Sequence, residues 1–242
     1  MKTLFLILIS LTLQVTATQG KTAEEWLKSL DHQLFLRSAS YSASMVVHTP
    51  NGDERTFKFD GKVVGSEFAL MEYTEPPRQK GTRYLKSGDA LWIYFPRQDR
   101  TMQIQGHMLR QGVQGGDMSF EDMTESKELL TQYEVTIGGE TDTSVTLALV
   151  SHDMTVSYPY REIVLDKRNS LPISIMNRDA SGNPLKMIKT LKTKQIGNRY
   201  YPVSTEIRSM LVKDKWTRFD VDNLQFDVVF SEDTFTKRGL ER

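Results

Sequence analysis

The sequence of 242 residues contains no cysteine. This excludes disulfide bonds and thiolate metal sites, and it excludes the acylated cysteine that anchors a bacterial lipoprotein. Histidine is also scarce. The four histidines lack the spacing of metal ligands: His32, His48, His107 and His152. We therefore expect no metal site.

Sequence motifs of catalysis are missing as well. The chain has no G-x-S-x-G elbow, no S-x-x-K pair and no H-E-x-x-H motif. The Gly20-Lys21-Thr22 triplet lacks the upstream glycine that a phosphate-binding loop requires. The sequence therefore predicts no catalytic residues, no cofactor and no enzymatic activity.

Charge of one sign is not in excess, because 31 basic residues balance 31 acidic residues. This balance gives no general attraction to nucleic acid or anionic membranes, so we expect no nucleic-acid partner. Long apolar runs are also missing apart from residues 4–13, which are about half as long as the roughly 20 residues of a spanning helix. With Lys2 before this run and small residues after it, residues 1–20 are typical of a cleaved secretory signal peptide. A retained membrane anchor is the alternative. We expect a protein of the periplasm.

Residues 21–242 are predicted to form a single domain, because no long linker or fixed-period repeat divides them. The domain begins with a helix in which Thr22 and Glu25 form a capping box. Apolar side chains recur at helical spacing in this segment: Trp26, Leu27, Leu30 and Leu34.

From Tyr41 onward the apolar period is two, which indicates strands. Turn signals separate about eleven strands, and the short connections make neighbouring strands antiparallel. The predicted fold is mainly β with a few helices. A sheet of this size must curl or close, and two modest helices cannot cover its apolar face tightly. The sequence therefore predicts a curved sheet with room for an apolar cavity.

Residues 112–123, "GVQGGDMSFEDM", allow three interpretations: a phosphate cradle, a metal site or a joint before a helix. Acidic side chains at the helix start would repel a phosphate, but they favour the helix itself through its dipole. Only the pairs Glu121/Glu125 and Asp122/Glu125 would share a helix face, which makes a weak metal site. A joint is the favoured interpretation.

The segment also contains helix-start signals. Ser119 is a good N-cap with Asp122 three residues later, and Met118 and Met123 suit a hydrophobic staple. These signals predict a glycine-rich joint followed by a capped helix that continues to Leu130. Two roles stay open: a rigid connection that fills the core, or a mobile cover over an apolar cavity.

Three blocks of sequence resemble a known family: "GTRYLK" at residues 81–86, "LWIYFP" at 91–96 and "GDMSFED" at 116–122. They resemble the outer-membrane lipoprotein-sorting proteins of the LolA-like superfamily. The resemblance covers most of residues 21–242 and is sharp between about Pro76 and Met123. By motif context, Arg83 is the nearest match to the functional arginine of the family's best-known carrier.

The resemblance implies a half-open antiparallel β-barrel with helices over its concave face. It also implies a periplasmic carrier that holds acyl chains of a lipid or lipoprotein and transfers them toward the outer membrane. Its partners would be an inner-membrane transporter and an outer-membrane acceptor. The alternative is a periplasmic lipid or lipoprotein sensor, an interaction module that binds a regulator or transporter and shuttles no cargo.

Strand parity and the cover segment together predict the residues that line the ligand cavity. The side chains expected to bind acyl chains are Phe57, Phe59, Leu85, Leu91, Ile93, Phe95, Met102, Ile104, Met118, Phe120 and Met123. The alternative is that they form a dry, packed core. A shift of one residue in register would turn Trp92 and Tyr94 inward instead.

Overall fold

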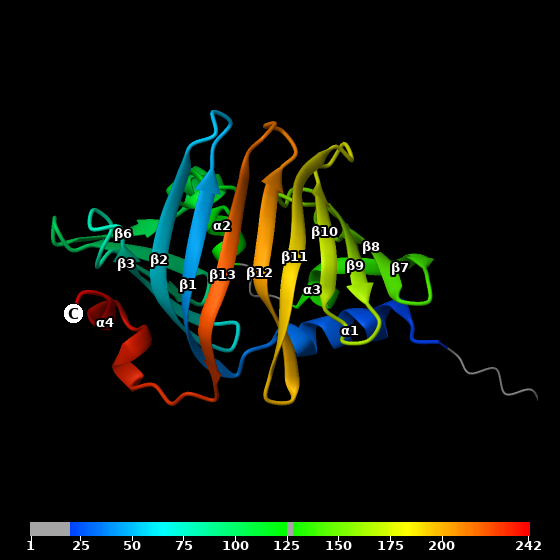
Figure 1. Cartoon of the computed structure of the whole chain (residues 1–242), viewed down its shortest axis with the longest axis horizontal. Helices are drawn as coiled ribbons and strands as arrows, with labels where there is room; N and C mark the ends of the chain where they lie inside the picture. The colour runs from blue at the N-terminus through cyan, green and yellow to red at the C-terminus, as the bar shows by residue number, and fades with distance from the viewer. Residues whose placement is uncertain (1–19, 125–127) are drawn as a thin grey trace, which may run out of the picture.

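The computed structural model describes residues 20–124 and 128–242. The predicted signal peptide lies outside these residues, apart from Gly20. The described chain forms one antiparallel sheet of 13 strands in the order β6-β5-β4-β3-β2-β1-β13-β12-β11-β10-β9-β8-β7. The sheet is curved and open, with β6 and β7 as its edges, and it bends around α2 and α3 (Figure 1). This confirms the predicted half-open barrel.

The strands follow one another with short connections. Their bounds are β1 Ser38–His48, β2 Glu54–Val64, β3 Phe68–Glu75, β4 Arg83–Ser87, β5 Ala90–Phe95, β6 Arg100–Ile104, β7 Tyr133–Glu140, β8 Ser144–Ser151, β9 Tyr160–Asp166, β10 Pro172–Arg178, β11 Pro184–Ile196, β12 Arg199–Ser209 and β13 Trp216–Phe226. The expected number of about eleven is too low.

The helices are short except for the first. Their bounds are α1 Ala23–Leu34, η1 Gly106–Arg110, η2 Val113–Gly115, α2 Phe120–Thr124, α3 Leu129–Gln132, η3 Glu232–Phe235 and α4 Lys237–Leu240. The capping box predicted for α1 is present: Thr22 and Glu25 each bind the other's backbone N–H through their side chains. The predicted helix from Ser119 to Leu130 crosses residues 125–127, which lie outside the described residues.

The topology explains how the glycine-rich segment reaches the concave face. Strands β1–β6 form one half of the sheet and β7–β13 the other, and the halves join where β1 pairs with β13. The two edge strands, β6 and β7, are consecutive in sequence. The chain between them must therefore pass from one edge of the sheet to the other, which places α2 and α3 inside the curve (Figure 1).

Buried apolar side chains gather in three clusters. The first joins strands β1–β6 to the segment between the edge strands, and it includes Met45, Phe57 and Tyr73. The second joins α1 to β7–β9 through residues such as Leu27 and Leu147.

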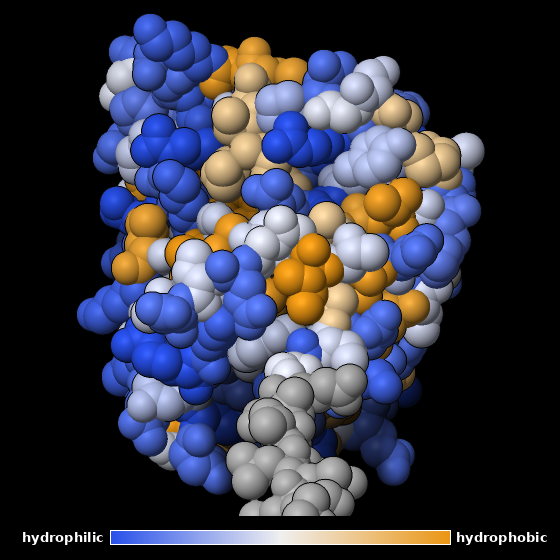
Figure 2. All heavy atoms as spheres, turned by 90° about the vertical axis from the view of Figure 1, so that its right-hand side faces the viewer, coloured by the Kyte–Doolittle hydropathy of each residue, from blue (hydrophilic) through white to orange (hydrophobic). Residues whose placement is uncertain are grey.

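At the β7 end of the molecule, the exposed apolar side chains form separate groups among polar ones (Figure 2). No helix within residues 20–124 and 128–242 is long and apolar enough to cross a membrane.

The third cluster lies on the other face of the sheet and was not predicted. Here the C-terminal segment with η3 and α4 covers β3–β5, and the fully buried Leu240 packs with Leu85 and Tyr94. Strands β3–β5 are therefore covered on both faces.

Candidate functional site

An apolar cavity of about 310 Å³ lies between the concave face of the sheet and the segment that crosses it. The lining side chains are apolar or aromatic with one exception, the charged Lys86. They come from Leu36, Tyr41, Ala43, Phe59, Val63, Ala69, Leu70, Met71, Tyr84, Lys86, Leu91, Met118, Met123, Tyr201, Phe219, Val221 and Leu224. Both halves of the sheet contribute, and Met118 and Met123 line the cavity from the crossing segment.

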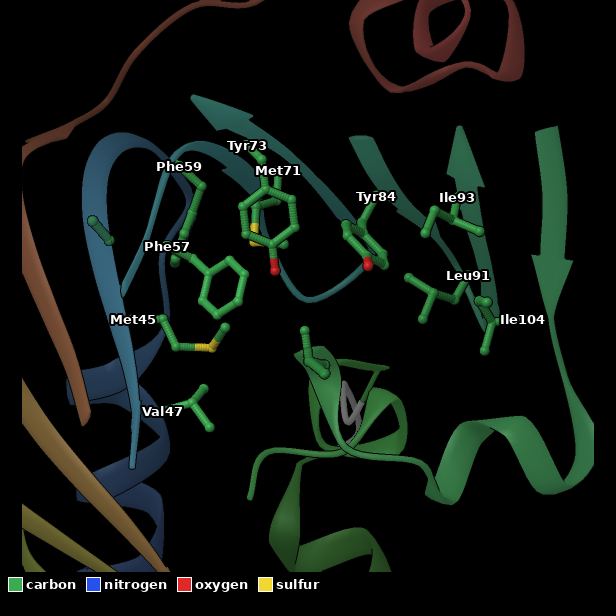
Figure 3. Close-up of a cluster of buried hydrophobic side chains, with 12 residues drawn as sticks. Met45, Val47, Phe57, Phe59, Met71, Tyr73, Tyr84, Leu91, Ile93 and Ile104 are labelled. Atoms are coloured by element: carbon green, nitrogen blue, oxygen red, sulfur yellow. The ribbon is translucent and has the colours of Figure 1, made fainter. Parts of the chain in front are cut away.

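Four of the eleven predicted ligand-binding residues line this cavity: Phe59, Leu91, Met118 and Met123. Six others belong to the adjoining apolar cluster: Phe57, Ile93, Phe95, Met102, Ile104 and Phe120. Figure 3 shows Phe57 of β2, Leu91 and Ile93 of β5 and Ile104 of β6 pointing toward the middle of this cluster. The structure thus brings ten of the predicted residues together, and their contact with a ligand stays a prediction.

The placement of Leu85 on the inward face is wrong. Its cross-strand partner is Trp92, and both side chains belong to the cluster under the C-terminal segment. The two-residue turn at Gly88 and Asp89 sets a register in which Leu91 faces Lys86, so Leu85 lies on the opposite face. For the same reason, the alternative register with Trp92 inward does not occur.

Arg83 also lies on the outer face. Its Nε donates to Glu72 Oε2 over 3.0 Å, and its Nη1 donates to the carbonyl of Leu240 over 3.0 Å. The guanidinium therefore joins β3 and β4 to the C-terminal segment. It does not line the cavity, so the expected match to a functional arginine has no support from its position.

Several cavity residues were missed, among them Tyr41, Tyr84 and Tyr201. The alternating pattern that begins at Tyr41 was a usable signal, because residues of the same parity share one face of a strand. Tyr41 requires a glycine opposite it: a Cβ on Gly61 would lie 2.2 Å from the Tyr41 ring. This close approach sets where the ring lies in the cavity wall.

The predicted capping of α2 is confirmed. Ser119 Oγ accepts from the N–H of Asp122 over 3.2 Å, and Asp122 Oδ2 accepts from the N–H of Ser119 over 2.7 Å. Asp122 also forms an ion pair with Lys186 of β11 and accepts from the hydroxyl of Tyr158 over 3.0 Å. Lys186 donates to the same hydroxyl over 2.7 Å. One side chain therefore both starts the helix and ties it to the other half of the sheet.

Asp117 has a role that the helix-start signals did not predict. Its Oδ2 accepts from the hydroxyl of Thr217 over 2.9 Å, and its backbone N–H donates to the Thr217 hydroxyl oxygen over 2.8 Å. Lys215 forms an ion pair with it at 3.5 Å. Gly116 makes this contact possible, because a Cβ there would lie 2.9 Å from the Thr217 hydroxyl. The segment is thus fixed to β13 through buried groups.

The remaining glycines allow the tight path of the segment. A Cβ on Gly112 would lie 2.1 Å from the carbonyl oxygen of Gly116, and Gly115 has a positive φ of 75°. Gln114 also has a positive φ of 54°, and its carbonyl accepts from Arg55 over 3.1 Å. These contacts favour a well-anchored segment at residues 112–123 over a mobile one.

The same segment, residues 112–123, also borders a polar cavity. A second cavity of about 510 Å³ is bordered by Gly116, Asp117 and Ser119 together with Tyr158 and Lys186. Met118, between two of these residues, lines the apolar cavity instead. The segment therefore separates a polar hollow from an apolar one.

Burial raises the pKa of Tyr84 to about 12, and burial also raises the pKa of Tyr41 to about 12. Both hydroxyls in the cavity wall therefore remain neutral at physiological pH. Within the described ranges, His, Asp and Glu side chains form no group of three that could hold a metal ion. The site offers apolar contact, neutral hydroxyls and one ammonium group.

Comparison with solved structures identifies similar folds at low sequence identity. A DUF1329 family protein from Desulfovibrio piger has a TM-score of 0.81 at 17% identity, covering 91% of this chain and 100% of that one. An outer membrane lipoprotein-sorting protein domain from Vibrio parahaemolyticus has a TM-score of 0.78 at 18% identity, covering 91% and 97%. A LolA superfamily protein from Nitrosomonas europaea has a TM-score of 0.74 at 19% identity, covering 90% and 99%.

Comparison by sequence gives one family. No curated protein matches the chain. A family model described as "Uncharacterized protein" matches residues 65–242, which is more than half of the sequence. The chain therefore belongs to that family. Its fold is similar to that of the LolA superfamily protein and of the lipoprotein-sorting protein domain.

Proposed function

We propose that the protein is a periplasmic carrier that binds an acyl chain of a lipid or lipoprotein in the apolar cavity and transfers it toward the outer membrane. The observation that supports this is the cavity of about 310 Å³, walled by the sheet on one side and by Met118 and Met123 on the other. Methionine is flexible and polarizable, so it adapts to apolar ligands of different shape.

The size of the cavity suits one chain. An apolar cavity of about 150 Å³ takes up benzene, so a cavity twice as large has room for about 12 carbon atoms. Each buried CH₂ contributes about 0.8 kcal/mol. A chain of that length would gain roughly 10 kcal/mol. Association costs of about 4 kcal/mol or more leave at most about 6 kcal/mol, which corresponds to a dissociation constant of about 40 μM or weaker.

The chemistry of the lining supports binding without a reaction. The tyrosine hydroxyls are neutral, and the described lining contains one charged side chain and no carboxylate. A general acid–base mechanism needs groups poised to exchange protons near neutral pH, and buried tyrosines are not. We therefore propose a non-enzymatic protein that releases its cargo to a membrane partner.

The tip of the β12–β13 hairpin suits contact with such a partner. Met210, Leu211 and Val212 are consecutive and exposed, and 71% of Leu211 is accessible to solvent. Neighbouring apolar side chains on a hairpin tip favour docking on another surface. An inner-membrane transporter and an outer-membrane acceptor are the proposed partners. The same tip supports the second candidate, a lipid or lipoprotein sensor that binds a regulator.

Native mass spectrometry of gently purified protein, followed by organic extraction, tests the carrier. A co-purifying lipid or acylated protein is the expected result. A protein that is empty as isolated and takes up no labelled phospholipid or lipopeptide would rule the carrier out. A lipid-loaded protein that holds a regulator and transfers nothing between vesicles would favour the sensor.

A further inference from the structure

Lys86 is a buried cation in the wall of an otherwise uncharged cavity. It lies in β4 opposite Leu91 of β5 and Ala69 of β3, and all three residues line the cavity. Only 5% of Lys86 is exposed. A buried ammonium group costs free energy unless it is paired, so its position requires a reason.

Its partners within the protein are few. Nζ donates to the backbone carbonyl of Ser66, in the turn between β2 and β3. An ammonium group has three N–H donors, so one acceptor leaves capacity for others. Within residues 20–124 and 128–242, Lys86 forms no ion pair with a carboxylate.

The surroundings act on the charge of Lys86 in two opposite directions. Burial lowers the pKa of Lys86, and the charges of Glu67 and Asp89 partly offset that effect. The two carboxylates belong to neighbouring turns and act on Lys86 only through space. An anion entering the cavity would meet a desolvated ammonium group, where charge-assisted hydrogen bonds are strong.

We propose that Lys86 binds the anionic head group, a carboxylate or a phosphate, of a single-chain amphiphile whose acyl chain occupies the cavity. The inference rests on the proposed function, because it takes the cavity to hold a chain. It adds that the cavity distinguishes one end of the ligand from the other. Apolar burial would supply the affinity and Lys86 the orientation and the preference for anions.

The test compares ligands with the same chain and different heads: dodecanoate, dodecyl phosphate and dodecanol, each displacing an uncharged fluorescent lipid. The wild-type protein should bind at least one of the anions about tenfold or more tightly than the alcohol. Lys86→Met should bring the ratio of the affinity for the anion to the affinity for dodecanol close to one. It should not weaken the binding of dodecanol. The better of the two anions identifies the class of head group.

Two further variants control the comparison. Lys86→Arg keeps the charge and should keep the preference for anions. Lys62→Met removes an exposed lysine of β2, two strands away from β4 in the sheet, and should change nothing. Equal anion preference in Lys86→Met, with thermal unfolding like that of the wild type, would overturn the head-group site and leave the carrier function intact. If the wild-type protein bound none of the three ligands, both the head-group site and the carrier function would be overturned.

Discussion

Lys186 of β11 forms an ion pair with Asp122 of α2, 64 residues away in the sequence. The pair joins the segment that crosses the concave face to the half of the sheet opposite the first apolar cluster. Only 10% of the Lys186 side chain and 18% of the Asp122 side chain are exposed. This largely buried ion pair therefore fixes the segment that covers the cavity to β11.

Lys186→Met should lower the free energy of unfolding by about 3 kcal/mol, because the remaining Asp122 carboxylate would lose its buried counter-ion. Urea unfolding measures this change. The matched control is Lys58→Met, which breaks an ion pair with Glu75 whose side chains are more than half exposed. That variant should lose less than about 1 kcal/mol. Equal losses in the two variants would show that the Lys186 pair does not hold the segment.

Gly112→Ala should destabilise the cover segment, because the new Cβ would lie 2.1 Å from the carbonyl oxygen of Gly116. A backbone clash cannot be relieved by a side-chain rotation, so we expect a loss of about 1–3 kcal/mol in unfolding free energy. Gly139→Ala is the control, since no atom lies within 4 Å of its new Cβ. A loss confined to Gly112→Ala would indicate a tightly packed segment, and a stable Gly112→Ala protein would indicate a segment free to move.

Gly61→Ala should narrow the cavity. Its Cβ would lie 2.2 Å from the Tyr41 ring, which would have to move within the cavity wall. We expect weaker binding of a labelled acyl chain, and recovery of binding in the double variant Gly61→Ala with Tyr41→Ala. Gly138→Ala, in a strand where the nearest atom would be 3.7 Å away, is the matched control. Unchanged binding in Gly61→Ala would show that the Tyr41 ring does not limit the cavity.

Stability should fall in alkaline solution. The pKa of Tyr84 is about 12 in the folded protein, whereas a tyrosine in an unfolded chain titrates near pH 10. The raised pKa contributes stability that is complete below about pH 10 and is lost as the pH rises through about 12, in total about 3 kcal/mol.

Urea unfolding at a series of pH values between about 9 and about 12 measures this loss. Tyr84→Phe should lose less stability over that interval than the wild type. Tyr200→Phe removes an exposed hydroxyl and should leave the pH dependence unchanged. If the wild type and Tyr84→Phe lost stability equally with rising pH, the claim that burial raises the pKa of Tyr84 would be contradicted.

Local pattern was sufficient to predict most of the sheet. Strands such as β2 alternate apolar and polar residues, and Phe57 and Phe59 face inward as predicted because one face of the sheet is buried. The Thr22 and Ser119 helix starts were also predictable, because caps depend on residues three positions apart. These features are encoded within a few residues of the chain.

Contacts between distant residues were not predictable in this way. Leu85 was misplaced because the turn at Gly88 and Asp89, not parity within one strand, decides which residue faces Leu91. The buried bond between Asp117 and Thr217 joins residues 100 positions apart. No spacing rule on one sequence connects such residues, so the role of Asp117 was not predicted.

The central claim is that the cavity behind Met118 and Met123 holds one acyl chain, and native mass spectrometry with a dodecyl amphiphile tests it most directly. We predict one bound molecule per wild-type protein. We predict none in the double variant Met118→Asp with Met123→Asp, whose charges in the cavity lining would oppose an apolar ligand. Met154→Asp, at an exposed methionine outside the cavity lining, should bind as the wild type does. A wild-type protein that binds no amphiphile, or a double variant that binds one as tightly as the wild type, would contradict the account.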